Sequence, residues 1–301
     1  MNYDHAYHAG NFADVLKHSV LCLALEHLNR KAKPYCVIDT HAGAGRYALA
    51  GEESRKTGEA ARGIVRLWDP TAPFGLTQAT SSPALAPYLD CLKAFGAEFS
   101  RSGGVPDDYP GSPLIAQHMM RPGDRLVAHE LKPASHAQLR AALRTQWHQA
   151  RDEGPKWTVE ASDGYQTLRA LLPPPERRGL VLIDPPFEQG DEFTRCLTAL
   201  ADFRKRWASG SLILWYPQKN IQEADLFVSE ATALFDGALH HVMLNVHPGH
   251  PPLRLTSCGL VLVNPPFGVT QQMPLLLDQL SLLLGEKGKA LTHWQKPSKS
   301  S

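Results

Sequence analysis

The sequence predicts an α/β fold, in which a mostly parallel sheet of seven strands is covered by helices on both faces. Short β-rich runs alternate with amphipathic stretches, and this alternation is typical of parallel strands joined by right-handed crossovers. The strand candidates are almost uniformly apolar, which indicates burial on both faces. With 301 residues, 43% of them hydrophobic and 20% charged, the chain can form one large or two small domains around an ordinary core.

Seven candidate strands follow one another along the chain, most of them bounded by turn or helix signals. They lie at 34–45, 124–133, 156–164, 178–187, 209–217, 239–246 and 257–267. Amphipathic stretches at 136–151 and 191–207 are candidate crossover helices. The final stretch, 285–301, is polar and rich in lysine, and we expect it to fray beyond the last helix.

Residues 52–111 interrupt the alternation. Helical pieces at 59–68 and 84–96 lie there between segments rich in glycine, proline and serine. We therefore expect a helical insertion subdomain at 52–111 and a sheet domain formed by residues 1–51 and 112–301.

Bulk composition argues against several classes of protein. The formal net charge is +1, too small for a general nucleic-acid coat, so any nucleic-acid contact must come from local patches such as 177–179 or 203–207. No apolar run approaches the ~18 residues of a membrane span, and the N-terminus does not resemble a secretory signal. Five cysteines are scattered without a CxxC pair, as in reduced proteins. We therefore expect a cytoplasmic protein without membrane association.

Acidic residues follow four successive strand candidates. Asp39 follows the first, Glu130 the second, Asp163 the third and Asp184 the fourth. Ligands of open α/β sheets bind beyond the carboxyl ends of strands, where such acids can accept hydrogen bonds from ribose hydroxyls or a base amino group. This ladder of acids predicts a nucleoside site at that edge of the sheet.

The turn after the first strand, DTHAGAG at 39–45, is rich in glycine. Glycines such as Gly43 permit positive φ and let a ligand approach the backbone. The dinucleotide pattern G-x-G-x-x-G is not completed, because Ala48 stands at its last position. The turn therefore favours a nucleoside ligand without a pyrophosphate.

Two helix starts carry capping signals. Asn11 is predicted to cap a helix that begins at the next residue, which places Lys17 and His18 about one turn or more inside it. Ser112 is a predicted N-cap followed by Pro113, and such a helix start can hold a ligand carboxylate. The N-terminal histidines include an HxxH pattern, but without HExxH or cysteine pairs we expect no metal site.

The fourth strand ends in IDPPF, at 183–187, which is a poor sheet sequence because proline donates no hydrogen bond. Asp184 and the carbonyl oxygen of Pro185 are two fixed acceptors, which suit the two N–H donors of an aromatic amine. Holding both hydrogens directs the nitrogen lone pair at an electrophilic methyl group, and Asp184 stabilises the positive charge that develops. Phe187 can stack on the base. The similar NPPF at 264–267 ends the last strand, where we do not expect the pocket.

DTHAGAG and IDPPF resemble the cofactor and catalytic motifs of S-adenosylmethionine-dependent amino-methyltransferases. A wider set of motifs resembles the RlmJ family, which methylates N6 of adenine 2030 in 23S ribosomal RNA. In this sequence the motifs are YDHAYHAGNFADVLKH, DTHAGAGRY, YPGSPLIA, SDGYQTL, RRGLVLIDPPFE and LWYP. The resemblance covers nearly the whole chain and is weakest at 70–108 and in the tail. It implies a Rossmann-like class I methyltransferase fold, S-adenosyl-L-methionine as cofactor, and 23S rRNA, free or in an assembly intermediate, as partner.

The resemblance also implies roles for single residues. The catalytic group would comprise Asp184, Pro185 and Phe187. Cofactor contacts would come from His18, His41, Gly43, Ser112, Glu130, Asp163, Gly164 and Asp184. Substrate RNA would be contacted by Tyr3, His5 and Lys17. One departure is Phe187, where tyrosine is commoner, and a phenyl ring stacks but offers no hydroxyl to position the base.

Other functions stay open from the residues alone. The same chemistry could act on adenine in DNA or on a protein glutamine side chain, because the net positive charge is weak. A non-catalytic RNA-binding module of ribosome assembly would need neither the cofactor nor Asp184. We expect a monomer.

Overall fold

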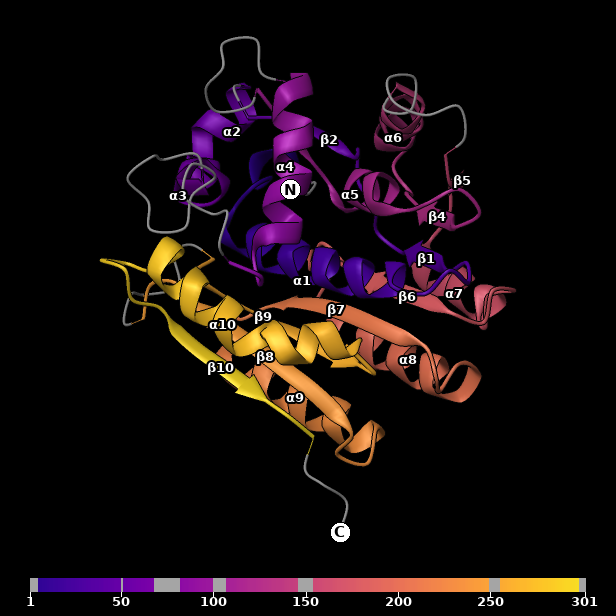
Figure 1. Ribbon diagram of the computed structural model, residues 1–301. Coiled ribbons are helices and arrows are strands. Elements are labelled where there is room, and N and C mark those ends of the chain that lie inside the picture. The colour runs from indigo at the N-terminus through magenta and orange to yellow at the C-terminus, as the bar shows by residue number, and fades with distance from the viewer. Residues whose placement is uncertain are drawn as a thin grey trace.

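An eight-stranded sheet forms the centre of the computed structural model, and helices cover both of its faces (Figure 1). The structure describes residues 5–49, 51–67, 82–99, 107–145, 154–248 and 255–297. The strands lie in the order β10-β8-β9-β7-β6-β1-β4-β5. In that order their bounds are Leu291–Gln295, Leu239–Asn245, Ser257–Val263, Ser211–Pro217, Gly179–Ile183, Cys36–Asp39, Arg125–His129 and Lys156–Glu160.

Most neighbouring strands are parallel, as the alternation of elements predicted. β1 pairs in parallel with β4 on one side and with β6 on the other, so the chain changes its direction of progress across the sheet at β1. β5 and β7 extend the parallel set. β9 is antiparallel to β7 and β8, and β10 is antiparallel to β8. The carboxyl ends of β1, β4, β5 and β6 therefore meet at one edge, next to this switch point, where ligands of such sheets bind.

Side chains of the central strand β6 alternate between two cores. Leu180 and Leu182 pack with α1, α5 and α10, whereas Val181 and Ile183 pack with α7, α8 and α9. All of β6 is buried, which explains its apolar run without alternation. The helix bounds are Phe12–Asn29 for α1, Ser112–Met119 for α5, Phe267–Leu284 for α10, Gly164–Leu171 for α7, Glu192–Arg206 for α8 and Ile221–Leu234 for α9.

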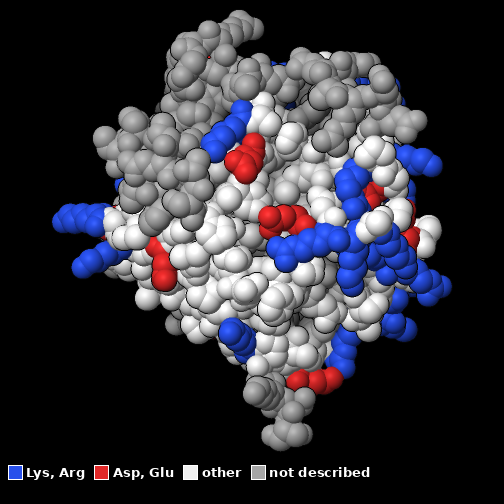
Figure 2. All heavy atoms as spheres, viewed as in Figure 1, with Lys and Arg blue, Asp and Glu red and all other residues white. Residues whose placement is uncertain are grey.

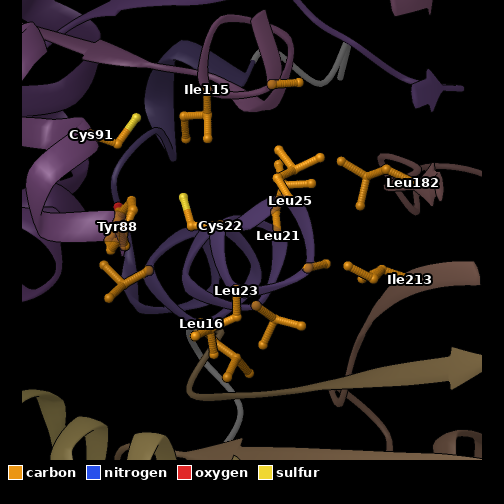
Figure 3. Close-up of a cluster of buried hydrophobic side chains, with 14 of the residues drawn as sticks. Leu16, Leu21, Cys22, Leu23, Leu25, Tyr88, Cys91, Ile115, Leu182 and Ile213 are labelled. Carbon is orange, nitrogen blue, oxygen red and sulfur yellow. The ribbon is translucent and has the colours of Figure 1, made fainter. Parts of the chain in front are cut away.

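Helix α1 is buried around most of its circumference. Asn11 caps it, as predicted. Figure 3 shows α1 with Tyr88 and Cys91 of α4 (Ala86–Phe99) on one side and with Leu182 and Ile213 of the sheet on the other. A helix that is enclosed in this way belongs to the core. Its charged residues therefore need partners inside the protein.

The predicted insertion is helical in its described parts. It contains α2 (Glu52–Thr57), α3 (Glu59–Arg62), the 3-10 helix η2 (Ile64–Leu67) and α4. An antiparallel pair joins its two ends, because β2 (Arg46–Ala48) lies beside β3 (Asp108–Pro110). The stretches 68–81 and 100–106 lie outside the described residues. The division into a sheet domain, 1–51 with 112–301, and an insertion subdomain stays a prediction.

The sheet has eight strands, so the prediction of seven was wrong by one. All seven predicted strands are present, and the additional one is β10, within the stretch that we expected to fray. The open edge of β8 supplies its hydrogen bonds, with Leu291 opposite Asn245. Residues of β10 are alternately exposed and half-buried, and Trp294 packs against the core. The polar composition concealed a strand whose partner lies far away in the sequence.

Candidate active site

A cavity of about 1100 Å³ lies at the edge of the sheet where the parallel strands end. Three acids of the predicted ladder line it: Glu130 after β4, Asp163 after β5 and Asp184 after β6. The other predicted site residues that line it are His5, Lys17, His18, His41, Gly43, Ser112 and Gly164. Typical ligand pockets have volumes of roughly 300–1,000 Å³, so this cavity has room for a nucleoside and a second flat group.

Asp39, the first acid of the ladder, lies beneath the cavity. It is 1% exposed and accepts a 2.7 Å hydrogen bond from Ser112 Oγ. Burial raises the pKa of Asp39 to about 6, although the bond from Ser112 opposes this shift. The prediction that Ser112 is an N-cap was wrong, because Gly111 is the cap and Ser112 is the first helical residue. Its hydroxyl turns to the buried carboxylate, which sequence spacing alone does not reveal.

The turn after β1 orients His41. Thr40 Oγ1 donates its hydrogen to the carbonyl oxygen of Leu182 at 3.0 Å, and it lies 2.8 Å from Nδ1 of His41. Since the hydroxyl hydrogen is engaged, Nδ1 must be the donor in this contact. Burial lowers the pKa of His41 to about 3, so the ring is neutral and its Nε2 is an acceptor.

Asp163 and Gly164 form the start of α7. Asp163 Oδ1 accepts from the backbone N–H of Tyr165 at 2.9 Å, and Oδ2 accepts from Arg195 at 2.6 Å. A Cβ at Gly164 would lie 2.1 Å from the carbonyl oxygen of Thr40, so only glycine fits between these two loops. Both carboxylate oxygens of Asp163 thus have a protein partner, and any ligand donor must share them.

Asp184 is tied to the N-terminal helix through Lys17. The ammonium group of Lys17 donates to Asp184 Oδ2 and, at 2.8 Å, to Asp14 Oδ1. Asp14 also accepts from the N–H of Gly10 at 2.8 Å and lies 3.2 Å from His5 Nε2. Among the described residues, none bonds to Asp184 Oδ1. One oxygen of the predicted catalytic carboxylate is therefore anchored, and the other is available.

Lys17 and Asp14 hold each other in their charged forms. Burial disfavours the ammonium form of Lys17, but Asp14 and Asp184 raise its pKa above the ordinary value. Burial also disfavours the Asp14 carboxylate, whereas Lys17 and His5 hold the pKa of Asp14 well below its usual range. Lys17 thus supplies one cation to two carboxylates, so these three side chains together carry one more negative charge than positive.

The loop after Asp184 is strained. Phe187 has φ of 50°, in the left-handed region that residues other than glycine rarely adopt. Such conformations persist where the surrounding structure enforces them, and they concentrate at functional sites. The Phe187 ring packs edge-on against Phe193 at 4.9 Å and Trp215 at 5.9 Å. It is not among the residues that line the cavity, whereas Pro186 is. Its stacking on a base, and the role of the Pro185 carbonyl, stay predictions.

His18 lines the cavity from α1 and is 1% exposed. Its Nδ1 lies 2.5 Å from the hydroxyl of Tyr109 in β3. Burial, reinforced by the neighbouring Lys17 ammonium, lowers the pKa of His18 to about 3. The ring is therefore neutral. Tyr3, the remaining predicted RNA contact, lies outside the described residues.

Sequence reasoning missed several residues of this site. One is Asp14, which binds the ammonium group of Lys17. In the sequence it is recognisable only as an acidic residue in the first turn of a predicted helix. Tyr47 of β2 lines the cavity and accepts from the N–H of Ala44 at 3.1 Å. Glu192 and Arg195 reach the cavity from α8. Their positions depend on how the strands and helices pack, and no spacing in the sequence marks them.

The second proline motif, NPPF, lies away from the cavity, as expected. Since β9 is antiparallel to β7, Val263 at its end pairs with Leu212 near the start of β7. Asn264 donates from Nδ2 to the carbonyl oxygens of Ala208 at 2.7 Å and Gly210 at 2.9 Å. This motif therefore ends its strand at the opposite edge of the sheet and holds a turn together.

The two basic segments singled out in the sequence also lie elsewhere. Arg178, just before β6, donates to the carbonyl oxygen of Lys33 at 2.6 Å and to that of Leu28 near the end of α1. Arg204 of α8 pairs with Asp236 at 2.5 Å. Figure 2 shows Lys and Arg side chains gathered over the right-hand ends of α1 and α7. At the end of α1, Arg178 and Arg121 donate to the carbonyl oxygens of Leu28 and Asn29, which is a structural role.

The described ranges contain neither a metal-binding cluster nor a helix suited to cross a membrane. His, Cys, Asp and Glu side chains form no group of three or more there that could hold a metal ion. No helix in the same ranges combines the length and the apolar character that crossing a membrane requires. The five cysteines are free and buried.

Comparison with known proteins finds relatives over nearly the whole chain. Residues 32–296 match the family described as ribosomal RNA large subunit methyltransferase D, RlmJ. The chain is 38% identical over 300 residues to ribosomal RNA large subunit methyltransferase J of Escherichia coli (strain K12), with 99% of both chains covered. It is 37% identical over 288 residues to the protein of that name from Haemophilus influenzae, with 96% of this chain and 95% of that one covered. A solved structure of a Legionella pneumophila protein has a TM-score of 0.82 at 29% identity, covering 97% of this chain and 99% of that one.

Proposed function

We propose that this chain, which belongs to the RlmJ family of ribosomal RNA large subunit methyltransferases, transfers a methyl group from S-adenosylmethionine to N6 of an adenine in 23S rRNA. The observation that carries the proposal is the position of Asp184. It follows β6 at the edge where ligands of such sheets bind, lines the cavity and keeps Oδ1 available.

The residues around the cavity fit a sulfonium nucleoside. Glu130 follows β4, next to the glycine turn of β1, where a carboxylate can accept from ribose hydroxyls. His18 and His41 are neutral, so neither repels a cationic sulfonium. When bound, S-adenosylmethionine supplies an electrophilic methyl group. The contacts of Gly43, Ser112, Asp163 and Gly164 with this cofactor are part of the proposal.

Asp184 would act on the adenine amino group. Its Oδ1 accepts one N–H of the amine, and the carbonyl oxygen of Pro185 accepts the other. With both hydrogens held, the nitrogen becomes more tetrahedral, so its lone pair is less delocalised into the ring and becomes nucleophilic. Lys17 keeps Asp184 in one orientation through Oδ2, so the carboxylate needs little rearrangement on substrate binding.

The charge of the network suits the reaction. As the new nitrogen–carbon bond forms, the sulfur–methyl bond of the cofactor would break and leave a neutral thioether, while positive charge develops on the amine nitrogen. Asp14, Lys17 and Asp184 together carry a net negative charge, so the cation between the two carboxylates does not cancel their stabilising effect. After transfer the methylated nitrogen is cationic and loses its proton easily, and Asp184 is placed to accept it.

The RNA substrate must present an unstacked adenine. A base inside a helix cannot reach Asp184, because the carboxylate lies in the cavity and not on the surface. We expect single-stranded or locally opened RNA, with Tyr3, His5 and Lys17 near it and Phe187 against the base. The proposal also includes adenine 2030 as the target and either an assembly intermediate or free RNA as the form of the substrate. It further includes a monomeric enzyme in the cytoplasm.

Mapping of N6-methyladenine in ribosomal RNA tests the function directly. Cells that lack this gene should lose one N6-methyladenine in 23S rRNA, and the gene supplied on a plasmid should restore it. An unchanged map, with methylated adenine in DNA or methylated glutamine in protein lost instead, would favour the same chemistry on another amine. A binding module would be favoured by a different result. Deletion of the gene would then leave methylation unchanged, and an Asp184→Ala variant would restore normal ribosome assembly.

A further inference from the structure

The hydroxyls of Tyr88 and Tyr109 form a buried chain that ends at His18. The two hydroxyl oxygens lie 2.9 Å apart, and the hydroxyl of Tyr109 lies 2.5 Å from His18 Nδ1. Both tyrosines are fully buried. Figure 3 shows Tyr88 on α4 facing α1, the helix that carries His18. The chain thus begins in the helical insertion and ends at the wall of the cavity.

The direction of the hydrogen bonds in this chain follows from counting hydrogens. A neutral imidazole carries one N–H. If Nδ1 carried it, Tyr109 would accept from His18 and donate to Tyr88, and the hydroxyl of Tyr88 would have no acceptor. No other hydrogen bond of Tyr88 is present in the described part of the chain. A buried donor without a partner costs about 1–3 kcal/mol.

The opposite direction gives both buried hydroxyl hydrogens an acceptor. Tyr88 donates to the oxygen of Tyr109, Tyr109 donates to Nδ1 of His18, and the imidazole hydrogen resides on Nε2. Within the described ranges no protein group bonds to that Nε2. His18 lines the cavity, so its N–H is left for a ligand.

We propose that Tyr109, supported by Tyr88, is a positioning residue that holds His18 in the Nε2–H tautomer and so makes it a hydrogen-bond donor to an acceptor oxygen of the cofactor. This inference rests on the proposed function, because it assigns the cavity to S-adenosylmethionine. The carboxylate of the cofactor is its strongest acceptor and is the group that we assign to His18.

Ring packing supports the same orientation. The rings of His18 and Tyr109 are stacked, with centroids 5.6 Å apart and an interplanar angle of 26°. Tilting the imidazole out of its present plane would break the stack, and turning it over within that plane would break the hydrogen bond. This hydrogen-bonded chain also assigns a function to the insertion, because α4 supplies Tyr88. The hydrogen bond from Tyr88 makes the Tyr109 hydroxyl a stronger donor to His18.

The protein contains a matched control outside the site. Tyr216 and His241 are also buried, their hydroxyl and Nε2 lie 2.5 Å apart, and their rings are stacked at 6.0 Å and 23°. Neither residue lines the cavity. A Tyr216→Phe variant therefore removes an equivalent hydrogen bond without affecting the ligand.

The test combines a spectrum with a titration on the full-length protein. Long-range ¹H–¹⁵N spectra of the histidine rings, with His18 assigned from the signal missing in His18→Gln, report the tautomer without any cofactor. Wild type should show an unprotonated Nδ1 and a protonated Nε2 at His18, and Tyr109→Phe should lose this pattern. Calorimetric titration with S-adenosylhomocysteine should show affinity about three- to tenfold weaker for Tyr109→Phe. The loss should be smaller for Tyr88→Phe and absent for Tyr216→Phe.

Two results would overturn the inference. One is a protonated Nδ1 at His18 in the folded wild type. The other is unchanged affinity in a Tyr109→Phe variant that melts as a folded protein. If wild type itself neither binds S-adenosylhomocysteine nor methylates RNA, the proposed function fails, and the spectrum then decides separately whether Tyr109 fixes the tautomer.

Discussion

Lys17 and Asp184 are 167 residues apart in the sequence, yet the ammonium group of the first donates to the carboxylate of the second. Lys17 is 4% exposed and Asp184 14% exposed, so the pair is shielded from solvent. The buried helix α1 carries Lys17, and the end of β6 carries Asp184. The packing of α1 against the sheet therefore determines the position of the predicted catalytic carboxylate.

Replacement of Lys17 by methionine should destabilise the protein and impair catalysis. It leaves the buried Asp14 carboxylate without its cation, and breaking such a pair costs roughly 3–5 kcal/mol. The double variant Lys17→Met with Asp14→Asn should regain most of the stability but not the activity, since Asp184 is still unanchored. Urea unfolding and methyl transfer to RNA measure the two effects. Full activity in the double variant would show that catalysis does not require Lys17 to anchor Asp184.

Gly164→Ala should weaken cofactor binding. The added Cβ would lie 2.1 Å from Thr40 O, so the start of α7 must move away from the β1 loop. Overpacking of this kind costs about 1–3 kcal/mol. Gly190→Ala is the control, because nothing lies within 4 Å of its added Cβ. Calorimetry should show weaker binding only for the first variant, and equal binding by both would contradict the tight fit at Gly164.

Asn264→Ala should reduce stability but leave the rate of methyl transfer unchanged. It removes two hydrogen bonds to backbone oxygens and leaves alanine at φ of 43°, a conformation that asparagine tolerates better. We expect a loss of about 1–2 kcal/mol in urea unfolding. A large fall in the rate of the folded variant would mean that the wrong proline motif has been assigned to catalysis.

The stability of the protein should depend on pH through His18. Burial lowers the pKa of His18 from 6.5 to about 3. Between these values the unfolded chain binds a proton that the folded protein does not, so the stabilisation is complete above about pH 6.5 and is lost as the pH falls towards 3. The unfolding free energy should therefore fall more steeply on acidification in wild type than in His18→Gln. Identical slopes in urea titrations across this range would show that His18 is protonated in the folded state.

The fold could be predicted well from the sequence because its signals are local. Apolar runs bounded by turns marked all seven strands of the predicted sheet, and Asn11 marked the start of α1. β10 was missed because its pairing with β8 is not local. The ladder of acids pointed to the cavity because strand ends in a parallel sheet share one edge, and three of its four members line this cavity.

The partners of the site residues could not be predicted in the same way. Asp14, Tyr88 and Tyr109 act through contacts between distant segments, and their side chains have no motif. Ser112 shows the limit clearly. Its position before proline predicted a helix cap, whereas the fold places the buried Asp39 carboxylate within reach and the hydroxyl bonds to it.

The most direct test of the account is a single-turnover measurement with Asp184→Asn. The enzyme is first saturated with S-adenosylmethionine, as confirmed by calorimetry, and is then mixed with a 23S rRNA fragment that contains the target adenine. The asparagine keeps the shape of the side chain but replaces the charge that stabilises the attacking nitrogen. We predict cofactor affinity close to that of wild type and a rate of N6-methyladenine formation lower by at least about a hundredfold. Transfer at the wild-type rate would contradict the role assigned to Asp184.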